Sequence, residues 1–79
     1  MTEYQDYLDF MYSLLDGKKG DLVLSETTEL VADIGLSSLE VMEFVEKIED
    51  QFDISIPLNI LPDVYTLGDF ARKLHEMDS

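Results

Sequence analysis

The 79-residue sequence predicts an all-α fold: a small three-to-four-helix bundle with a long loop between the first and second helices. Apolar residues recur every three or four positions in segments 3–16, 38–52 and 67–76, which is the spacing of one helix face. No segment alternates apolar and polar residues for long enough to predict a sheet. The chain has no cysteine and is 46% apolar, so we expect a single domain, residues 1–79, that is stabilised by packing alone.

The first helix is expected over residues 3–16. Thr2 is its expected N-cap, because Gln5 stands three residues later and completes a capping-box pattern. Gly17 follows and is the expected C-terminal stop. The apolar stripe of this helix consists of Tyr4, Tyr7, Leu8, Met11, Leu14 and Leu15.

Residues 18–36 form a long connection without sustained periodicity, although residues 27–33 could form one helical turn. A connection of this length is uncommon in a small chain and is often functional. We expect five apolar side chains to attach it to the core: Val23, Leu24, Leu30, Val31 and Ile34.

Residues 38–52 are the strongest helix signal, with apolar positions spaced by three or four residues. We interpret Met42 and Phe44 as core residues. Leu39 and Val41 are equally compatible with the core and with an exposed partner-contact patch. The predicted stripe consists of Leu39, Met42, Val45, Ile48 and Phe52.

The C-terminal third predicts two further helical segments. Pro62 limits the segment "LNILPDVY" to one or two turns. The last helix is expected over residues 67–76, with Thr66 as its N-cap and Asp69 near its first turn. His75 lies near the end of that helix, where a cation beside the last carbonyls is a simpler interpretation than a catalytic group.

Composition and charge exclude several functions. The net charge of −13 argues against binding nucleic acid or an anionic membrane, favours partners with basic surfaces and favours a monomer. A single histidine and the absence of a glycine-rich phosphate loop or a calcium loop indicate that the protein is not an enzyme and holds no metal. The sequence shows no signal peptide and no apolar run long enough to span a bilayer, so we expect a cytoplasmic protein.

Two adjacent serines precede the central helix. The pattern S-S-L-E predicts a capping box in which Ser37 is the N-cap and Glu40 reaches back to its N–H. Ser38 is then the first helical residue, beside free N–H groups and the positive end of the helix dipole, where a phosphate would be favoured. An ordinary first-turn serine is the alternative interpretation of this position.

The run of residues 30–57 resembles the core of an acyl carrier protein. That family has an Asp-Ser-Leu motif after a glycine-containing turn, then a glutamate-rich helix, a Phe-Asp pair and an Ile-Pro pair. The segment "TLGDFARKL" continues the similarity into the last helix. The matching residues here are Gly35, Ser37, Ser38, Leu39, Phe52, Asp53, Ile56 and Pro57.

The resemblance implies a carrier rather than a catalyst. It implies that Ser38 bears 4′-phosphopantetheine, donated by coenzyme A through a phosphopantetheinyl transferase, and that acyl groups travel on its thiol as thioesters between enzymes. It further implies that the acidic helix docks on basic patches of acyl-loading and synthase enzymes. The expected docking residues are Leu39, Glu40, Val41, Met42, Glu43 and Glu46.

The chain departs from the family pattern at several positions. Ser37 replaces the usual aspartate, Glu46 and Lys47 stand where fatty-acid carriers often have small or apolar residues, and Pro62 interrupts the third segment. These departures favour a specialised pathway, such as polyketide or mixed polyketide–peptide assembly. The alternatives are a carrier of primary fatty-acid synthesis, an aminoacyl or peptidyl carrier and, in a different class, an unmodified acidic helical module for protein–protein interaction.

Overall fold

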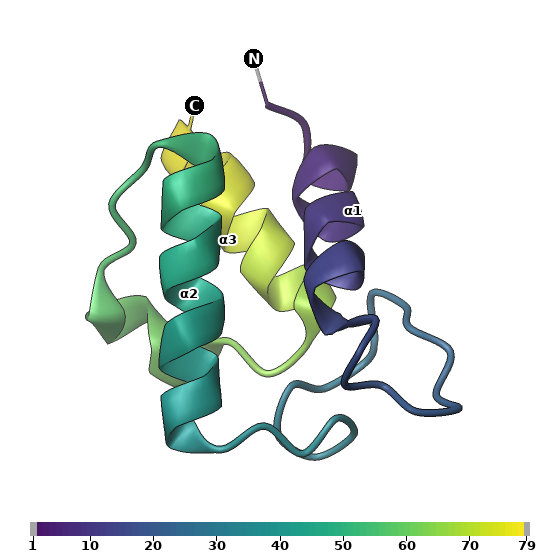
Figure 1. Cartoon of the computed structure of the whole chain (residues 1–79). Coiled ribbons are helices and arrows are strands. Elements are labelled where there is room, and N and C mark those ends of the chain that lie inside the picture. Colours follow the sequence, from purple (N-terminus) through teal and green to yellow (C-terminus); the bar gives the residue numbers. More distant parts are fainter. Residues whose placement is uncertain (1, 79) are drawn as a thin grey trace.

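The computed structural model describes residues 2–78 and contains four helical segments (Figure 1). They are α1 (Tyr4–Leu15), α2 (Ser38–Phe52), the short 3-10 helix η1 (Leu58–Asp63) and α3 (Leu67–Asp78). Residues 2–78 form no strand, and an isolated bridge joins Glu29 to Thr66. The predicted all-α bundle with a long first loop is therefore confirmed.

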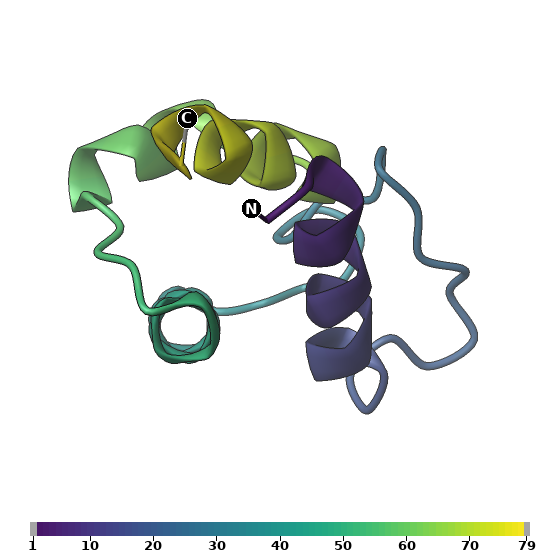
Figure 2. The same cartoon turned by 90° about the horizontal axis from the view of Figure 1, so that it is seen from above.

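Helix α1 packs mainly against α3 and makes a smaller contact with α2. Figure 2 shows this from above, with α2 seen end-on and α3 crossing beside α1. The start of α1 and the end of α3 lie at one end of the molecule, whereas α2 begins at the opposite end (Figure 1). None of the described helices is long and apolar enough to cross a membrane.

The core is formed by one face of each long helix together with three residues from the connections. Phe52 of α2 contacts two aromatic rings of α1, with ring centroids 4.7 Å from Tyr7 and 5.5 Å from Phe10. The Phe44 and Phe70 rings lie 5.9 Å apart and join α2 to α3, and aromatic pairs at such distances add to the stabilisation from burial. The buried apolar residues are Tyr7, Leu8, Met11, Leu15, Leu30, Leu36, Phe44, Val45, Ile48, Ile56, Leu67, Phe70, Ala71 and Leu74.

The prediction that Met42 is a core residue was wrong, and Leu39 also lies outside the core. Their side chains are 37% and 68% exposed. Each step of three residues turns a helix by about 300°, about 60° short of a full turn. A stripe that advances only by threes therefore winds off the buried face, which here follows positions 41, 45, 48 and 52. Phe44, the other predicted core residue, is buried.

The N-terminus of α1 is capped one residue later than predicted. Glu3 is the N-cap, and its N–H donates to the Asp6 carboxylate across 2.9 Å. The prediction that Thr2 and Gln5 form the cap was therefore wrong. A carboxylate at the third helical position also interacts favourably with the helix dipole, which the Gln5 amide would not do.

The chain leaves α1 through a turn after Leu15 and not through a left-handed glycine. Gly17 lies just beyond the helix as expected, but the glycines with positive φ angles are Gly20 (60°) and Gly35 (82°). The Lys18 N–H donates to the Leu15 carbonyl across 2.9 Å. This turn fixes the position of the Lys18 backbone relative to the end of α1.

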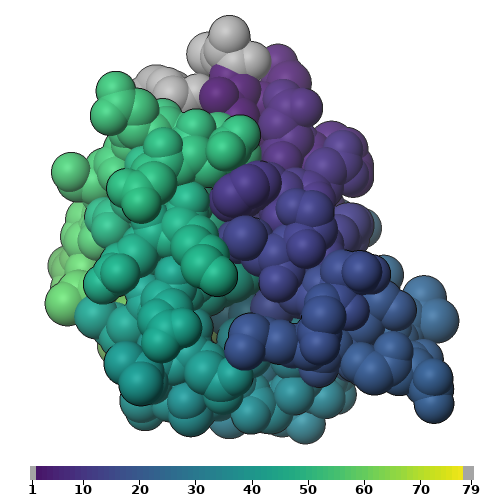
Figure 3. Space-filling model, viewed as in Figure 1, coloured from purple at the N-terminus to yellow at the C-terminus, as the bar shows by residue number. Residues whose placement is uncertain are grey.

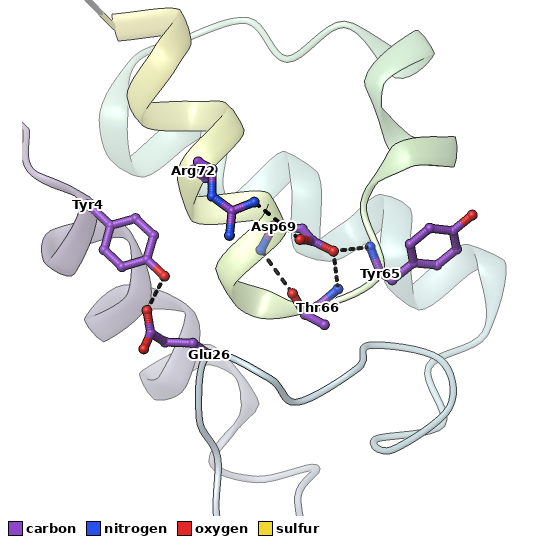
Figure 4. Close-up of polar contacts among 6 residues, drawn as sticks. All are labelled: Tyr4, Glu26, Tyr65, Thr66, Asp69 and Arg72. Carbon is purple, nitrogen blue, oxygen red and sulfur yellow. Dashed lines mark hydrogen bonds and ion pairs between the residues drawn. The ribbon is translucent and has the colours of Figure 1, made fainter.

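The long loop is held at its second half against α1 and α3. The Tyr4 hydroxyl donates to the Glu26 carboxylate (Figure 4), a contact that raises the pKa of Tyr4 to about 12. The Gly68 N–H donates to the Glu26 carbonyl across 2.8 Å, and the Leu67 N–H donates to the Thr28 carbonyl across 2.9 Å. Two backbone hydrogen bonds thus attach the loop to the first turn of α3.

Only part of the predicted attachment of the loop to the core is present. Leu30 is buried and Leu24 and Ile34 are partly buried, but Val23 and Val31 are 84% and 64% exposed, so those two predictions were wrong. Apolar residues in a loop show no regular spacing, so the sequence does not distinguish the side chains that face the core from those that face solvent. Residues 27–33 form turns and no helix.

The C-terminal elements follow the predictions closely. The segment around Pro62 is the short helix η1. At the start of α3 the Thr66 hydroxyl accepts from the Asp69 N–H across 3.0 Å, and the Asp69 carboxylate accepts from the Thr66 N–H across 3.1 Å (Figure 4). The hydrogen bond from the Thr66 N–H, together with one from the Tyr65 N–H, lowers the pKa of the Asp69 carboxyl group. His75 lies in the last turn of α3, with Nε2 at 3.9 Å from the Glu3 carboxylate.

Candidate functional site

The start of α2 is set by the residues just before it. Gly35 takes a φ of 82°, a left-handed conformation that glycine adopts without a steric penalty. Leu36 follows and is buried, with its N–H donating to the Leu30 carbonyl across 3.1 Å. The loop therefore ends at a buried anchor, and the next residue begins the cap.

The predicted capping box at Ser37 is present. The Ser37 hydroxyl accepts from the Glu40 N–H across 3.2 Å, and the Glu40 Oε1 accepts from the Ser37 N–H across 3.0 Å. Each of the two side chains accepts a hydrogen bond from a backbone N–H group that would otherwise be unpaired at the helix terminus. The Ser37 hydroxyl is thus engaged in the cap of the helix.

A third residue, Lys18, joins this cap. Its Nζ lies 2.8 Å from the Glu40 Oε2. The hydrogen bond from Lys18, followed by the one from the Ser37 backbone, lowers the pKa of Glu40 to about 2, and the same ion pair raises the pKa of Lys18. The sequence analysis missed Lys18, because no local spacing rule relates residues 22 positions apart.

Ser38 is the first residue of a 15-residue helix, and its side chain is exposed. The N–H groups of the first helical turn have no intrahelical partners, and the helix dipole is positive at this end. An oxygen-rich anionic group attached to this hydroxyl would therefore be stabilised by its surroundings.

An apolar groove begins beside Ser38. One part of it, about 460 Å³, is lined by the two serines and by Val31, Val41 and Leu61, among others. A second part of about 480 Å³ shares those three apolar residues and continues to Tyr65. We call the two parts together the Ser38 groove. The remaining lining residues are Glu29, Leu30, Ala32, Leu36, Met42, Pro62 and Val64.

The six expected docking residues divide into two groups. Leu39, Met42, Glu43 and Glu46 are exposed on the outer side of α2, and Figure 3 shows the surface of α2 in teal beside α1 in purple. Val41 packs against the core, and both Val41 and Met42 line the Ser38 groove. Glu40 is occupied by the cap and by Lys18.

Residues 2–78 contain no cluster of three or more histidine, aspartate or glutamate side chains suited to hold a metal ion. His75 is on α3, and its Nε2 lies 3.9 Å from the Glu3 carboxylate. The candidate site consists of the exposed Ser38 hydroxyl, the helix terminus and the adjoining Ser38 groove.

Comparison with known proteins shows the family of this chain. Residues 18–74 match the family model described as "Phosphopantetheine attachment site". The chain belongs to this family, the acyl carrier proteins. Its matched region includes both serines, the whole of α2 and most of α3.

Several curated acyl carrier proteins are similar in sequence. A probable acyl carrier protein of Caulobacter vibrioides is 40% identical over 45 residues, covering 57% of this chain and 52% of the relative. An acyl carrier protein of a Sulfurovum species is 39% identical over 49 residues, covering 62% and 65%. One from Phenylobacterium zucineum is 32% identical over 53 residues, covering 67% of each chain. The match to the first two spans only about half to two thirds of their length.

Members of this family are carriers and have 4′-phosphopantetheine as a covalently attached prosthetic group. The residues present fit such a group, because an exposed hydroxyl stands at a positive helix terminus and an apolar groove lies beside it. When attached, the group supplies a terminal thiol, which this cysteine-free chain lacks.

Proposed function

We propose that this protein carries acyl intermediates as thioesters on a phosphopantetheine arm attached to Ser38. The observation that carries the proposal is the exposed first-turn hydroxyl of Ser38 at one end of the Ser38 groove, within the segment that matches the family. Ser37 is engaged in the capping box, which favours Ser38 as the attachment residue. The protein itself catalyses no step in this proposal.

The attachment step is a group transfer to the serine oxygen. The Ser38 Oγ forms a phosphoester bond with the pantetheine-side phosphorus of coenzyme A, and the anhydride bond of coenzyme A breaks. Adenosine 3′,5′-bisphosphate leaves, and the hydroxyl proton passes to a base of the transferase. The role of this chain is to hold the hydroxyl at a helix terminus whose N–H groups favour the resulting phosphodiester.

Intact-mass measurement tests the attachment. The protein is incubated with coenzyme A, magnesium and a broad-specificity phosphopantetheinyl transferase. We expect one phosphopantetheine mass increment in the wild type and in Ser37→Ala, and none in Ser38→Ala. An increment that survives Ser38→Ala would contradict the assignment. An unmodified wild type would instead favour the acidic interaction module that needs no arm.

We further propose that carrier and enzymes meet through the outer face of α2. The exposed apolar side chains of Leu39 and Met42 stand beside Glu43 and Glu46, which is the composition of a small contact patch with a charged rim. Basic patches on a transferase or synthase would be attracted to this face, which speeds encounter without requiring tight binding.

A salt series tests this docking face. The double variant Glu43→Lys with Glu46→Lys should slow modification strongly at low ionic strength and far less at high ionic strength, since exposed charges are screened. Asp9→Lys with Asp21→Lys makes the same charge change on α1 and the loop, and serves as the control. Equal losses in the two double variants, or a loss that salt does not reduce, would contradict a localised electrostatic surface.

For the pathway, we propose a specialised assembly system of the polyketide or mixed polyketide–peptide type. The support is the serine at position 37 in place of aspartate and the charged pair Glu46 and Lys47 on the outer side of α2. Holo protein would be offered in parallel to a malonyl transferase, a long-chain acyl ligase and an amino-acid adenylating enzyme. Preferential malonyl loading is expected, whereas exclusive loading by either of the other two would contradict the proposal.

A further inference from the structure

Lys18 contacts both the end of α1 and the start of α2. Lys18 is fixed to α1 through its N–H, which donates to the Leu15 carbonyl across 2.9 Å. Its Nζ reaches the Glu40 Oε2 at 2.8 Å. In Figure 3 the blue surface that follows α1 borders the teal surface of α2, where these segments meet.

Glu40 uses both of its carboxylate oxygens at this junction. Oε2 binds Lys18, and Oε1 accepts from the Ser37 N–H across 3.0 Å. The Glu40 N–H in turn donates to the Ser37 hydroxyl. A continuous chain of contacts therefore runs from α1 through Lys18, Glu40 and Ser37, and it ends one residue before Ser38.

The lysine side chain is only 47% exposed. It lines a small cavity of about 20 Å³ together with apolar residues that include Leu14, Leu36 and Phe44. A lysine at this place can lay its methylene groups along the apolar lining while its ammonium group reaches Glu40. The alkyl stem is thereby guided toward one position, which reduces the rotamer entropy that the ion pair must overcome.

We propose that Lys18 is a positioning residue for the modification of Ser38, an inference that rests on the proposed carrier function. Lys18 acts through Glu40 and Ser37, and does not touch the reacting hydroxyl. It holds the carboxylate that closes the capping box, and so holds the first turn of α2 in the orientation that presents Ser38. The same contact pairs the charge of Glu40, so that Glu43 and Glu46 are the expected acidic docking residues outside the capping box.

Loss of the ammonium group should affect turnover and not encounter. In Lys18→Met the Glu40 carboxylate is free to rotate, and the first turn of α2 spends part of its time open, so Ser38 is correctly presented in a smaller fraction of the bound carrier–transferase complexes. We expect kcat for transferase-catalysed modification to fall about two- to fivefold, in keeping with the modest strength of exposed ion pairs. KM for the carrier should not rise, because Glu43 and Glu46 are unchanged.

The experiment compares the wild type with three variants at saturating coenzyme A, well below their unfolding temperatures. Lys18→Met removes the charge and keeps the alkyl chain, Lys18→Arg keeps the charge, and Lys19→Met is the matched control that removes a neighbouring charge outside this chain of contacts. We expect a lower kcat only in Lys18→Met, with recovery in Lys18→Arg. Hydrogen exchange of the Glu40 N–H should be faster in Lys18→Met alone.

The outcomes separate the two proposals. A modified wild type with an unchanged kcat in Lys18→Met would overturn the positioning role and leave the carrier function standing. An equal loss in Lys19→Met, or a rise in KM without a fall in kcat, would also overturn it, because charge or docking would then be the cause. A wild type that gains no mass would overturn the carrier function and this inference with it.

Discussion

Alanine substitution at Ser37 should lower the stability of the protein and leave modification possible, whereas alanine at Ser38 should abolish modification and leave the stability nearly unchanged. Ser37→Ala removes the hydroxyl that accepts from the Glu40 N–H across 3.2 Å, and loss of a serine N-cap costs about 1 kcal/mol. For a chain of 79 residues, an unfolding entropy of about 2.1 cal/mol/K per residue gives about 0.17 kcal/mol/K. The unfolding temperature should therefore fall by about 6 °C. Ser38→Ala loses no cap, and its free energy of unfolding should change by less than about 0.5 kcal/mol.

Thermal unfolding followed by circular dichroism, beside intact-mass analysis, checks both properties in the same samples. Ser37→Ala should be less stable but still accept the arm, and Ser38→Ala should be as stable as the wild type and accept none. Ser37→Asp is the control, because aspartate caps as well as serine and should leave the unfolding temperature nearly unchanged. A larger loss of stability in Ser38→Ala than in Ser37→Ala would refute the division of roles.

Three further predictions concern stability. Gly68→Ala should be destabilised by about 1–3 kcal/mol, because its Cβ would lie 2.9 Å from the Glu26 carbonyl oxygen; an unchanged urea midpoint would show that the loop can yield. Asp53→Gly should raise stability by about 0.5–1 kcal/mol, because Asp53 has a φ of 53°; thermal unfolding measures this, and a lower midpoint would contradict it. The folded state lowers the pKa values of Glu40 and Asp69, so their contribution is fully present above the unfolded values and is lost as pH falls through the lowered ones. Urea midpoints should therefore decrease from about pH 5 to pH 2, and Asp69→Asn should show a shallower decrease.

The elements that could be predicted from sequence depend on local interactions. The caps at Ser37 and Thr66 each involve a partner three residues away, so the pattern and the structure contain the same information. At the first helix two possible capping patterns, Thr2 with Gln5 and Glu3 with Asp6, are offset by one residue. The structure has the pair Glu3 and Asp6. The Asp6 carboxylate both accepts a hydrogen bond and interacts favourably with the positive end of the helix dipole.

Exposure was harder to predict than helicity. The positions 39, 43, 46 and 50 are spaced by four, three and four residues and share one face of α2, as do 41, 45, 48 and 52 on the buried face. Reading Leu39 and Met42 by steps of three hid this division, and both side chains are exposed. Two exposed apolar side chains near each other on an acidic helix are compatible with a contact surface, whereas a single one would need no explanation.

The parts of the site that could not be predicted are made by contacts between distant segments. The Ser38 groove combines Val31 of the loop, Val41 of α2 and Leu61 of η1. Lys18 meets Glu40 across 22 positions. Neither contact leaves a periodic or short-range signature, since each depends on how the loop returns across the bundle after α1.

The arrangement of the helix ends bears on how this protein can be handled. The start of α1 and the end of α3 lie together, with His75 close to Glu3, while the start of α2 is at the far end of the molecule (Figure 1). A dye, a fused protein or a link to a solid support placed at either of those helix ends would stand away from Ser38. An immobilised carrier would then present its serine outward, so enzymes in solution could be assayed on it in succession.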